Sequence, residues 1–455
     1  MRFELIPWLS ISGQIWMQIF VTILLVYMLW KYRKDNISLL FILLSWPRVF
    51  VFYGKTIENL YKIAMLLLCI YFFYQLYAYR VFQKRERWLL ITFALFSIQF
   101  ILSVFLYTQN TLTIVLSQYS RYVEILLLYF IVKYIIYNGK GERLLALFYD
   151  IGLMQIIISV FKMFAIGWQM EGLVGSFTII GGAQGTTIPI LWFINLWYYR
   201  KGKFGKWDWL YILGLLLIGF TTGKRAVMFI LPVVVAAFMI YVPKLRLKGS
   251  TIAITILLVP LLLYLGVRLT PTLNPENKIW GSFDIDYALN YGKDYSMGEM
   301  DEDGNREKGV GRVGATLLMI DWIKDVDNYD IHSWFGHGVE RIYTSNEFED
   351  YYDKDYNFGI NHRGSMTGAV MWYLAFGIVG LVLFMIYYWF LFRIIPYQRL
   401  RFALYGMVMF DFIFYNAQMI RDPFICVLVI FVMYYSRLKY TNTGIFLKSD
   451  IGAFL

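Results

Sequence analysis

Apolar runs of membrane-spanning length recur along nearly the whole of this 455-residue chain. A segment that crosses the hydrocarbon core of a membrane needs roughly 20 mostly apolar residues. A soluble domain could not hide so much apolar surface, because 59% of the residues are hydrophobic and only 16% are charged. The sequence therefore predicts an all-α polytopic integral membrane protein with about 12–14 transmembrane helices. The candidate spans are roughly 14–31, 37–53, 59–79, 88–106, 117–137, 144–165, 185–199, 208–222, 225–243, 250–268, 366–392, 402–416 and 422–436.

Basic residues are concentrated in every second connection between these spans. By the positive-inside rule, such connections are cytoplasmic, so the N-terminus is predicted to lie outside and the C-terminus inside. This distribution accounts for most of the net charge of +11 without any nucleic acid. The basic residues concerned are Lys31, Arg33, Lys34, Arg80, Lys84, Arg85, Arg87, Lys140, Arg143, Arg200, Lys201, Lys203, Lys206, Lys244, Arg246, Lys248, Arg393, Arg399, Arg401, Arg437 and Lys439.

One long connection, residues 269–365, divides the chain. Residues 1–268 hold the first ten predicted helices, and 366–455 hold the last three with a cytoplasmic tail. The connection is predicted to lie outside as a large periplasmic loop, where acidic residues outnumber basic ones by about two to one. The spacing of apolar residues in 313–326 predicts a helix within it. A connection of this length is usually functional.

No metal or cofactor is expected. Cys69 and Cys426 both lie in apolar runs and are interpreted as small core residues. All three histidines, His332, His337 and His362, lie in or beside the long loop, but without the ligand spacing of a zinc site.

Two outward polar segments lie in the middle of the chain. "EGLVGSFTIIGGAQGT" (171–186) contains Gly175 and Gly182, and its glycines permit either a tight turn or close approach to a ligand. Lys224 and Arg225, in "FTTGKRAVMF", interrupt a long apolar run on the side where basic residues are disfavoured. They either bind an anionic ligand such as a phosphate or extend to the water interface.

Two further segments lie in or beside the long loop. Arg312 begins the predicted loop helix, where its charge opposes the helix dipole, so it either binds a phosphate or is a surface charge. His337 lies in the glycine turn "WFGHGVE". His362 and Arg363, in "NFGINHRGSMTGAV", stand at the outer end of the span 366–392. A histidine there could exchange a proton near neutral pH or serve a structural role.

The order of these segments resembles the O-antigen polymerase and O-antigen ligase superfamily (Wzy-type polymerases and WaaL-type ligases). The similarity covers roughly 140–390: "VGSFTIIGGAQG", then "TTGKRA", then "GVGRVGATLLMIDWIKD" with "WFGHG", and finally "NHRGSMTGAVMWYLAFGIVGL". The resemblance implies a multi-pass protein of the bacterial cytoplasmic membrane, with one large extracytoplasmic loop before the last spans. Its implied activity is glycosyl transfer from a polyprenyl-diphosphate-linked oligosaccharide on the outer face.

The resemblance also implies roles for the site residues. His362 would be the base for an acceptor hydroxyl, and Arg225 and Arg312 would stabilise the diphosphate leaving group. Lys224, Arg363, His337, Gly175 and Gly182 would contact the diphosphate or sugars. No metal, cofactor or nucleic acid takes part, and a chain-length regulator and a flippase of the same pathway are possible partners.

Three functions fit these observations. Polymerisation of repeat units into O-antigen, capsule or exopolysaccharide is the first, and transfer of the glycan to lipid A core or protein by a ligase is its nearest alternative. A flippase or another transporter of lipid-linked oligosaccharides belongs to a different class. A transporter would place charged residues near the middle of the membrane.

Overall fold

The computed structural model describes the chain at 11–46, 55–77, 86–105, 112–166, 174–177, 184–200, 204–221, 260, 263–268, 270, 273–278, 280–297, 311–325, 330–338, 366–393, 398–414 and 422–440. In these segments the regular structure is helical and contains no β-strand, so the all-α prediction is confirmed there.

Helices occupy the predicted apolar runs wherever those runs are described. The run 225–243 and residues 250–259, 261 and 262 of the run 250–268 lie outside the described residues. A helix inside the long loop is confirmed, since residues 312–324 are helical. The helices are α1 (Ile11–Lys31), α2 (Asn36–Leu44), α3 (Lys55–Tyr77), α4 (Arg87–Phe105), α5 (Leu112–Tyr137), α6 (Gly141–Ile166), α7 (Gln184–Arg200), α8 (Lys206–Thr221), α11 (Ile285–Met297), α12 (Arg312–Lys324), α13 (Ile331–Phe335), α15 (Gly368–Phe392), α16 (Gln398–Phe414) and α18 (Pro423–Tyr440).

The helix α2 is shorter than the run 37–53 that predicts it. It ends at Leu44, and the N–H of the following Ser45 still bonds back to the carbonyl of Phe41 at 3.1 Å. Pro47 comes two residues later, and a proline disfavours helical backbone in the residue before it. The periodicity of apolar residues alone does not predict that α2 ends here.

The chain forms two compact units, and neither is continuous in sequence. The first contains residues 1–81, 123–266 and 422–455, and the second contains 82–122 and 267–421. The helix α5 passes from the second unit into the first at Tyr122. The long loop and the helices α15 and α16 that follow it thus belong to the second unit, whereas the span before the loop belongs to the first unit up to residue 266.

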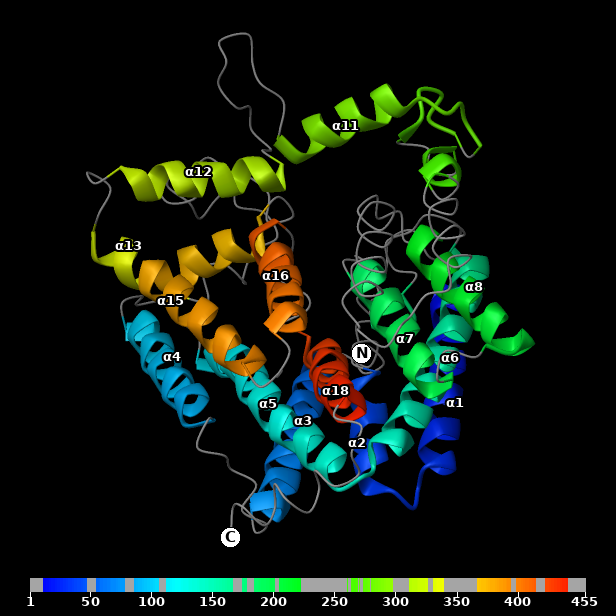
Figure 1. Cartoon of the computed structure of the whole chain (residues 1–455), viewed down its shortest axis with the longest axis horizontal. Helices are drawn as coiled ribbons and strands as arrows, with labels where there is room; N and C mark the ends of the chain where they lie inside the picture. Colours follow the sequence, from blue (N-terminus) through cyan, green and yellow to red (C-terminus); the bar gives the residue numbers. More distant parts are fainter. Residues whose placement is uncertain are drawn as a thin grey trace. The chain divides into compact units, whose positions relative to one another are not determined.

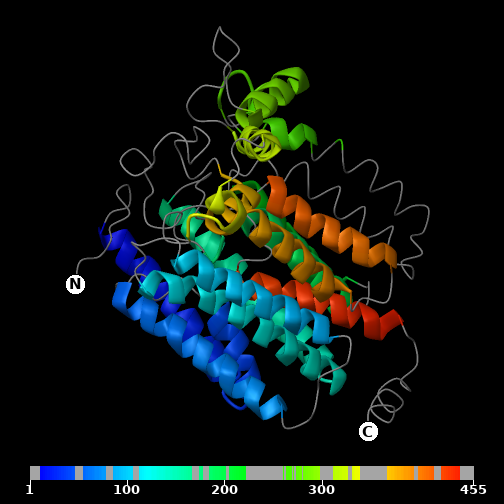
Figure 2. The ribbon, with the colours of Figure 1, turned by 90° about the vertical axis from the view of Figure 1, so that its left-hand side faces the viewer.

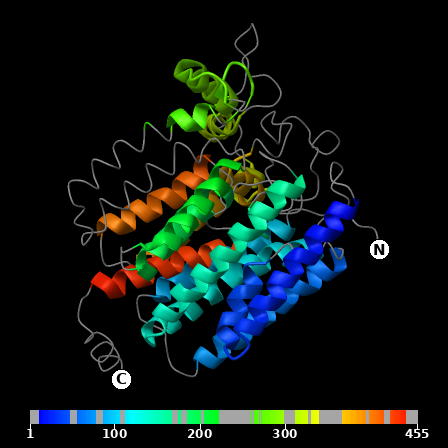
Figure 3. The ribbon, with the colours of Figure 1, turned by 90° about the vertical axis from the view of Figure 1, so that its right-hand side faces the viewer.

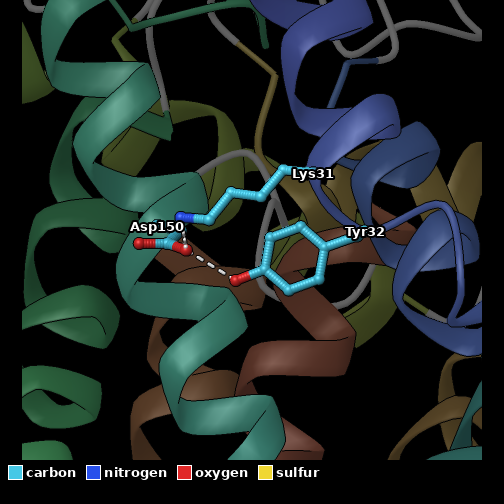
Figure 4. Close-up of polar contacts among 3 residues, drawn as sticks. All are labelled: Lys31, Tyr32 and Asp150. Atoms are coloured by element: carbon cyan, nitrogen blue, oxygen red, sulfur yellow. Dashed lines mark hydrogen bonds and ion pairs between the residues drawn. The ribbon is translucent and has the colours of Figure 1, made fainter.

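In the first unit, α6 packs against α1, α7 and α8, and α18 packs against α2 and α7 (Figure 3). Lys31 and Tyr32, at the end of α1, both reach Asp150 on α6 (Figure 4). The Lys31 Nζ and the Tyr32 hydroxyl each lie 2.5 Å from Asp150 Oδ2. Burial and the adjacent carboxylate raise the pKa of the Tyr32 hydroxyl well above its usual value, so it stays protonated and donates. These bonds fix one end of α1 against α6.

In the second unit, α15 is the central helix. It packs against α4, α13 and α16, and α12 lies across its start (Figures 1 and 2). Aromatic rings fill the space between these helices. Phe384 of α15 stacks on Phe412 of α16 with ring centroids 4.0 Å apart, and Trp372 stacks on Phe96 of α4 at 5.4 Å. Large rings bury much apolar area each, so this aromatic core fixes α4, α15 and α16 as a group.

Two described helices, Gly141–Phe164 and Gly368–Phe392, are long and apolar enough to cross a membrane. Several shorter helices are apolar as well: Ile15–Lys31, Leu60–Gln75, Arg87–Leu102 and Pro423–Tyr435. The surface that they expose is also apolar. On α1, for example, Met17, Val21 and Met28 are buried while Ile23 and Trp30 are exposed.

Candidate functional site

The structure describes three of the residues predicted to form the site. Arg312 and His337 belong to the second unit, and Gly175 belongs to the first. The others lie outside the described residues: Lys224, Arg225, Gly182, His362 and Arg363. The candidate site is therefore built from the second unit, where two predicted residues lie on elements that pack on the same helix.

Arg312 is the first residue of α12 and is half-buried. Its helix is anchored one turn further on by Thr316, which is almost completely buried. The Thr316 hydroxyl lies 2.9 Å from the carbonyl oxygen of Ile413, near the end of α16, and 3.0 Å from the Thr367 hydroxyl. Thr367 is the N-cap of α15 and accepts a hydrogen bond from the Val370 N–H. The Thr316 hydroxyl thus joins α12, the start of α15 and the end of α16.

His337 belongs to a loop that binds to a break in α15. The break is at Gly377, where φ is +66° and ψ is −165°, so the run 366–392 is not one continuous helix as predicted. Backbone carbonyls beside the break accept hydrogen bonds from the loop: His337 N–H donates to Leu374 O at 2.7 Å, and Gly338 N–H to Ala375 O at 3.2 Å. Carbonyls exposed by an interrupted helix need such partners, above all in a membrane.

Gln99 of α4 completes this junction. Its side-chain amide donates to the Phe335 carbonyl at 3.1 Å and to the Phe376 carbonyl at 2.9 Å. Across the break itself, the Trp372 indole N–H donates to the Gly380 carbonyl at 2.9 Å. Buried carbonyls that lack donors destabilise a fold, so one glutamine holds both the loop and the broken helix.

Two glycines meet where the loop touches the helix. Gly336 has φ +83° and ψ 178°, and Gly377 has a similar backbone conformation that only glycine adopts readily. A Cβ on Gly336 would stand 2.2 Å from the Ala375 backbone, and one on Gly377 would stand 2.3 Å from the Trp334 carbonyl carbon. The two backbones approach this closely because neither glycine carries a side chain.

The loop also brings two of the three histidines together. The rings of His332 and His337 stack with centroids 4.6 Å apart and planes 12° apart. His332 Nδ1 lies 3.2 Å from the Gly336 carbonyl, which can only accept, so this nitrogen carries the proton.

Asp330 caps the short helix α13 beside this histidine pair. Its Oδ1 accepts from the Ser333 N–H at 2.7 Å and from the Ser333 hydroxyl at 2.9 Å. Desolvation raises the pKa of the Asp330 carboxyl, but the bonds from Ser333 and the positive charge of the two histidines lower it by more. The net pKa is below the usual value, so Asp330 is a carboxylate at neutral pH.

Gly175 forms part of a buried turn in the first unit. Its φ is +53°, and its N–H donates to the Ser159 hydroxyl at 2.8 Å. The following Ser176 donates from its N–H to Gln155 Oε1 at 2.6 Å and from its hydroxyl to the Ser45 carbonyl at 2.8 Å. A Cβ on Gly175 would stand 2.1 Å from Gln155 Oε1. Packing within the protein therefore explains why position 175 requires glycine.

Several polar groups of the second unit were not predicted from the sequence. His332 had a signal, since it lies five residues before His337 in a chain with 3 histidines. Gln99 and Thr316 had none, because Gln99 bonds to Phe335 and Phe376 and Thr316 bonds to Thr367 and Ile413, all distant in sequence. The partner of Asp330 is Ser333, only three residues further on, so this cap had a local signal that was missed.

Among the described residues, no three His, Cys, Asp or Glu side chains gather to hold a metal ion. The chain matches no known protein family, no curated protein and no solved structure. The function proposed below therefore rests on the residues themselves.

Proposed function

We propose that this protein is a polysaccharide polymerase of the bacterial cytoplasmic membrane. It joins polyprenyl-diphosphate-linked oligosaccharide repeat units on the outer face, through a metal-independent inverting glycosyl transfer. The proposal includes a polytopic chain of about 12–14 spans, with residues 269–365 outside and the C-terminus in the cytoplasm.

The observation that carries the proposal is the contact between two motifs that are far apart in sequence. The Thr316 hydroxyl, one turn after Arg312, lies 3.0 Å from the Thr367 hydroxyl at the start of α15. His362 and Arg363 precede Thr367 by five and four residues. The helix that begins at Arg312 therefore contacts the start of the span that directly follows the His362 motif in sequence, which supports the proposal.

The exposed faces of the helices support membrane insertion. On α1, exposed Ile19, Ile23, Val26 and Trp30 follow helical spacing, opposite a buried apolar face. The same holds on α4, where Ile91, Leu95, Ile98 and Ile101 are exposed, among other apolar residues. In water, exposed apolar surface of this extent would promote aggregation, whereas the acyl chains of a bilayer would cover it.

The proposed reaction places the donor's tail in the bilayer and its diphosphate at the outer boundary. The acceptor hydroxyl attacks the anomeric carbon, its proton passes to His362, and the bond between that carbon and the diphosphate oxygen breaks. The electron pair leaves with the polyprenyl diphosphate. Arg225 and Arg312 stabilise its growing negative charge, assisted by Lys224 and Arg363. Fixed cations suit this step because an arginine can donate two hydrogen bonds to a phosphate.

Buried charges in the helices favour a second candidate, a transporter of lipid-linked oligosaccharides. Glu124 and Lys133 on α5, Lys162 on α6 and Asp411 on α16 are almost completely buried. Charged residues inside spans often mark a transport path. However, only Glu124 lies near the middle of its helix, and the other three lie about one turn from a helix end. Polymerisation therefore remains the first proposal.

Purified full-length protein in lipid nanodiscs, supplied with lipid-linked repeat units from its native cell, tests the proposal. We expect a ladder of lengthened glycans, reduced about 100-fold or more by Arg312→Ala and partly kept by Arg312→Lys. Lys324→Ala is the matched control, because Lys324 lies at the other end of α12 and its ion pair with Asp321 is exposed.

The products distinguish the alternatives. A ladder that forms only when lipid A core is added would show a ligase. In proteoliposomes, rapid movement of a labelled donor between leaflets without any ladder would show a transporter and contradict polymerisation.

A further inference from the structure

The described residues at the start of the long loop and just before it (267, 268, 270, 273–278 and 280–284) are named the Trp280 loop here. It is organised around the fully buried Asn274. The Asn274 side-chain amide donates to the Thr270 carbonyl at 3.0 Å and to the Lys278 carbonyl at 2.9 Å, and its Oδ1 accepts from the Lys278 N–H at 3.2 Å. The loop is therefore held by its own hydrogen bonds.

The backbone at Trp280 is in an unusual conformation. Its φ is +67°, which bulky side chains rarely adopt. Hydrogen bonds to Arg268 fix this geometry: the Trp280 N–H donates to the Arg268 carbonyl at 2.7 Å, and Arg268 Nε donates to the Gly281 carbonyl at 2.8 Å. Strained residues that the surrounding structure holds in place are common at ligand sites.

The Trp280 side chain is partly exposed to solvent. The guanidinium carbon of Arg268 lies 4.5 Å from the ring centroid, so a cation–π contact covers part of the ring. The residue nevertheless remains 51% exposed. A large ring that is held on one side and accessible on another has little conformational entropy left to lose when it binds a ligand.

Most of the exposed residues described between 275 and 284 are polar or charged, although Phe283 is exposed as well. Glu276, Lys278, Ser282 and Asp284 are all exposed. The Ser282 N–H and hydroxyl donate to Glu276 Oε2 at 2.6 and 2.9 Å, which lowers the pKa of that carboxyl. A tryptophan that anchors a loop in lipid would be surrounded by apolar residues, because charges oppose entry into the bilayer. The exposed charges near Trp280 in the sequence favour a hydrated ligand.

We propose that Trp280 is a stacking platform for a pyranose ring in the glycan of the lipid-linked substrate. A sugar presents apolar C–H groups on one face and hydroxyls at its edge, which suits an exposed aromatic ring in a segment that also exposes polar side chains. Arg268 is the positioning residue that holds the ring. This inference deepens the proposed function, since it rests on the substrate being a glycan.

The test measures glycan binding separately from polymerisation. The probe is the oligosaccharide released by mild acid from the cell's own lipid-linked repeat units and labelled with a fluorophore at its reducing end. Its anisotropy is titrated with full-length protein in nanodiscs. We expect Trp280→Gly to weaken binding by about tenfold or more, and Trp280→Phe, which keeps an aromatic face, by only a few-fold.

Glycine is chosen as the replacement so that a loss of binding can be distinguished from a loss of folding. Glycine adopts a positive φ without strain, so Trp280→Gly removes the ring while relieving the backbone. Trp209→Ala is the matched control, because Trp209 is 61% exposed at the start of α8 in the first unit. We expect that control to bind the probe as the wild type does.

The possible failures can be told apart. Wild-type affinity in Trp280→Gly, or no binding of the probe by the wild type, would overturn the platform. If a ladder of glycans still forms in that case, the polymerase proposal stands alone. If Trp280→Gly weakens binding but no ladder forms with any variant, the platform stands and the polymerase proposal fails.

Discussion

Gly336 and Gly377 lie where the loop that contains His337 contacts the break in α15. Alanine at either position would place its Cβ 2.2–2.3 Å from backbone atoms of the other segment. Both positions also need a backbone conformation that strains any other residue. We expect Gly336→Ala and Gly377→Ala each to lower the free energy of unfolding by about 2 kcal/mol or more. Thermal melting of the purified protein in detergent measures this loss.

Gly406→Ala is the control for that prediction. Gly406 lies within α16, and a Cβ there would meet no atom within 4 Å. Alanine is also the better helix former, so this change should leave the melting temperature unchanged or raise it slightly. Equal losses at Gly406 and Gly377 would show that close approach is not the reason for glycine.

Asp330 makes the loop sensitive to acid. The pKa of its carboxyl in the folded protein is lower than the ordinary value of 3.8, so the folded state binds fewer protons in this range. The stabilisation is complete above about pH 5 and is lost as pH falls through the lowered pKa. Exchange of the Ser333 amide hydrogen, corrected for its intrinsic rate, should therefore accelerate in acid.

The Asp330→Asn variant isolates this effect. Asparagine keeps an acceptor oxygen for the Ser333 N–H but does not titrate. We expect its corrected exchange rate to be flat over the same pH range and faster than the wild-type rate at neutral pH. If the wild-type and Asn proteins show the same acid dependence, another group controls the loop.

At the scale of elements, Thr316 connects three helices through one hydroxyl. We expect Thr316→Val to lower the free energy of unfolding by about 1–3 kcal/mol, because the shape stays similar while the Ile413 carbonyl loses its donor. The same change should reduce glycan polymerisation, since it frees the helix that carries Arg312. Chemical denaturation and the ladder assay measure the two effects.

Thr316→Ser keeps the hydroxyl and is the control for this experiment. We expect it to retain most of the stability and most of the polymerisation. Loss of stability in Thr316→Val with full polymerisation would mean that the position of α12 does not matter for the reaction.

The sequence predicts helices better than it predicts their junctions. Spans such as 88–106 and 144–165 agree with α4 and α6 to within a few residues, because apolar length alone determines them. The break at Gly377 was not predicted, since glycine is common inside membrane helices and apolar residues continue on both sides. Its cause is the loop that contains His337, whose N–H groups replace the helix's own donors.

The candidate site was predictable only in part for the same reason. Arg312 and His337 stand out because their residue types are unusual in an apolar chain. Thr316 and Gln99 act through partners that are distant in sequence, and a single sequence does not reveal such pairs. The stacking of His332 on His337 depends on the turn at Gly336, which follows from the same contact with α15.

At the scale of the whole molecule, the order of helices along the chain does not match the division into units. The second unit takes α4 and the start of α5 from the first third of the chain and joins them to the region 267–421. Gln99 on α4 accordingly meets carbonyls of residues 335 and 376. Apolar runs give the number of helices, but they do not say which helices pack together.

Cysteine labelling tests the predicted orientation of the chain in the membrane. Asn290→Cys on α11 should react with a membrane-impermeant maleimide in intact spheroplasts, because Asn290 is exposed in the loop assigned to the outside. Asn138→Cys, exposed in the turn between α5 and α6, should react only after permeabilisation. The native Cys69 and Cys426 are buried, so the unmodified protein serves as the background control.

The reverse labelling pattern would have a direct consequence for function. If Asn138→Cys reacted in intact spheroplasts and Asn290→Cys did not, residues 269–365 would lie in the cytoplasm. Arg312, on the loop helix α12, would then be separated from glycans that have already been moved to the outer face. A cation on the cytoplasmic side could not stabilise a diphosphate leaving group on the other side, because such interactions act over only a few ångströms. The polymerase proposal therefore requires this orientation.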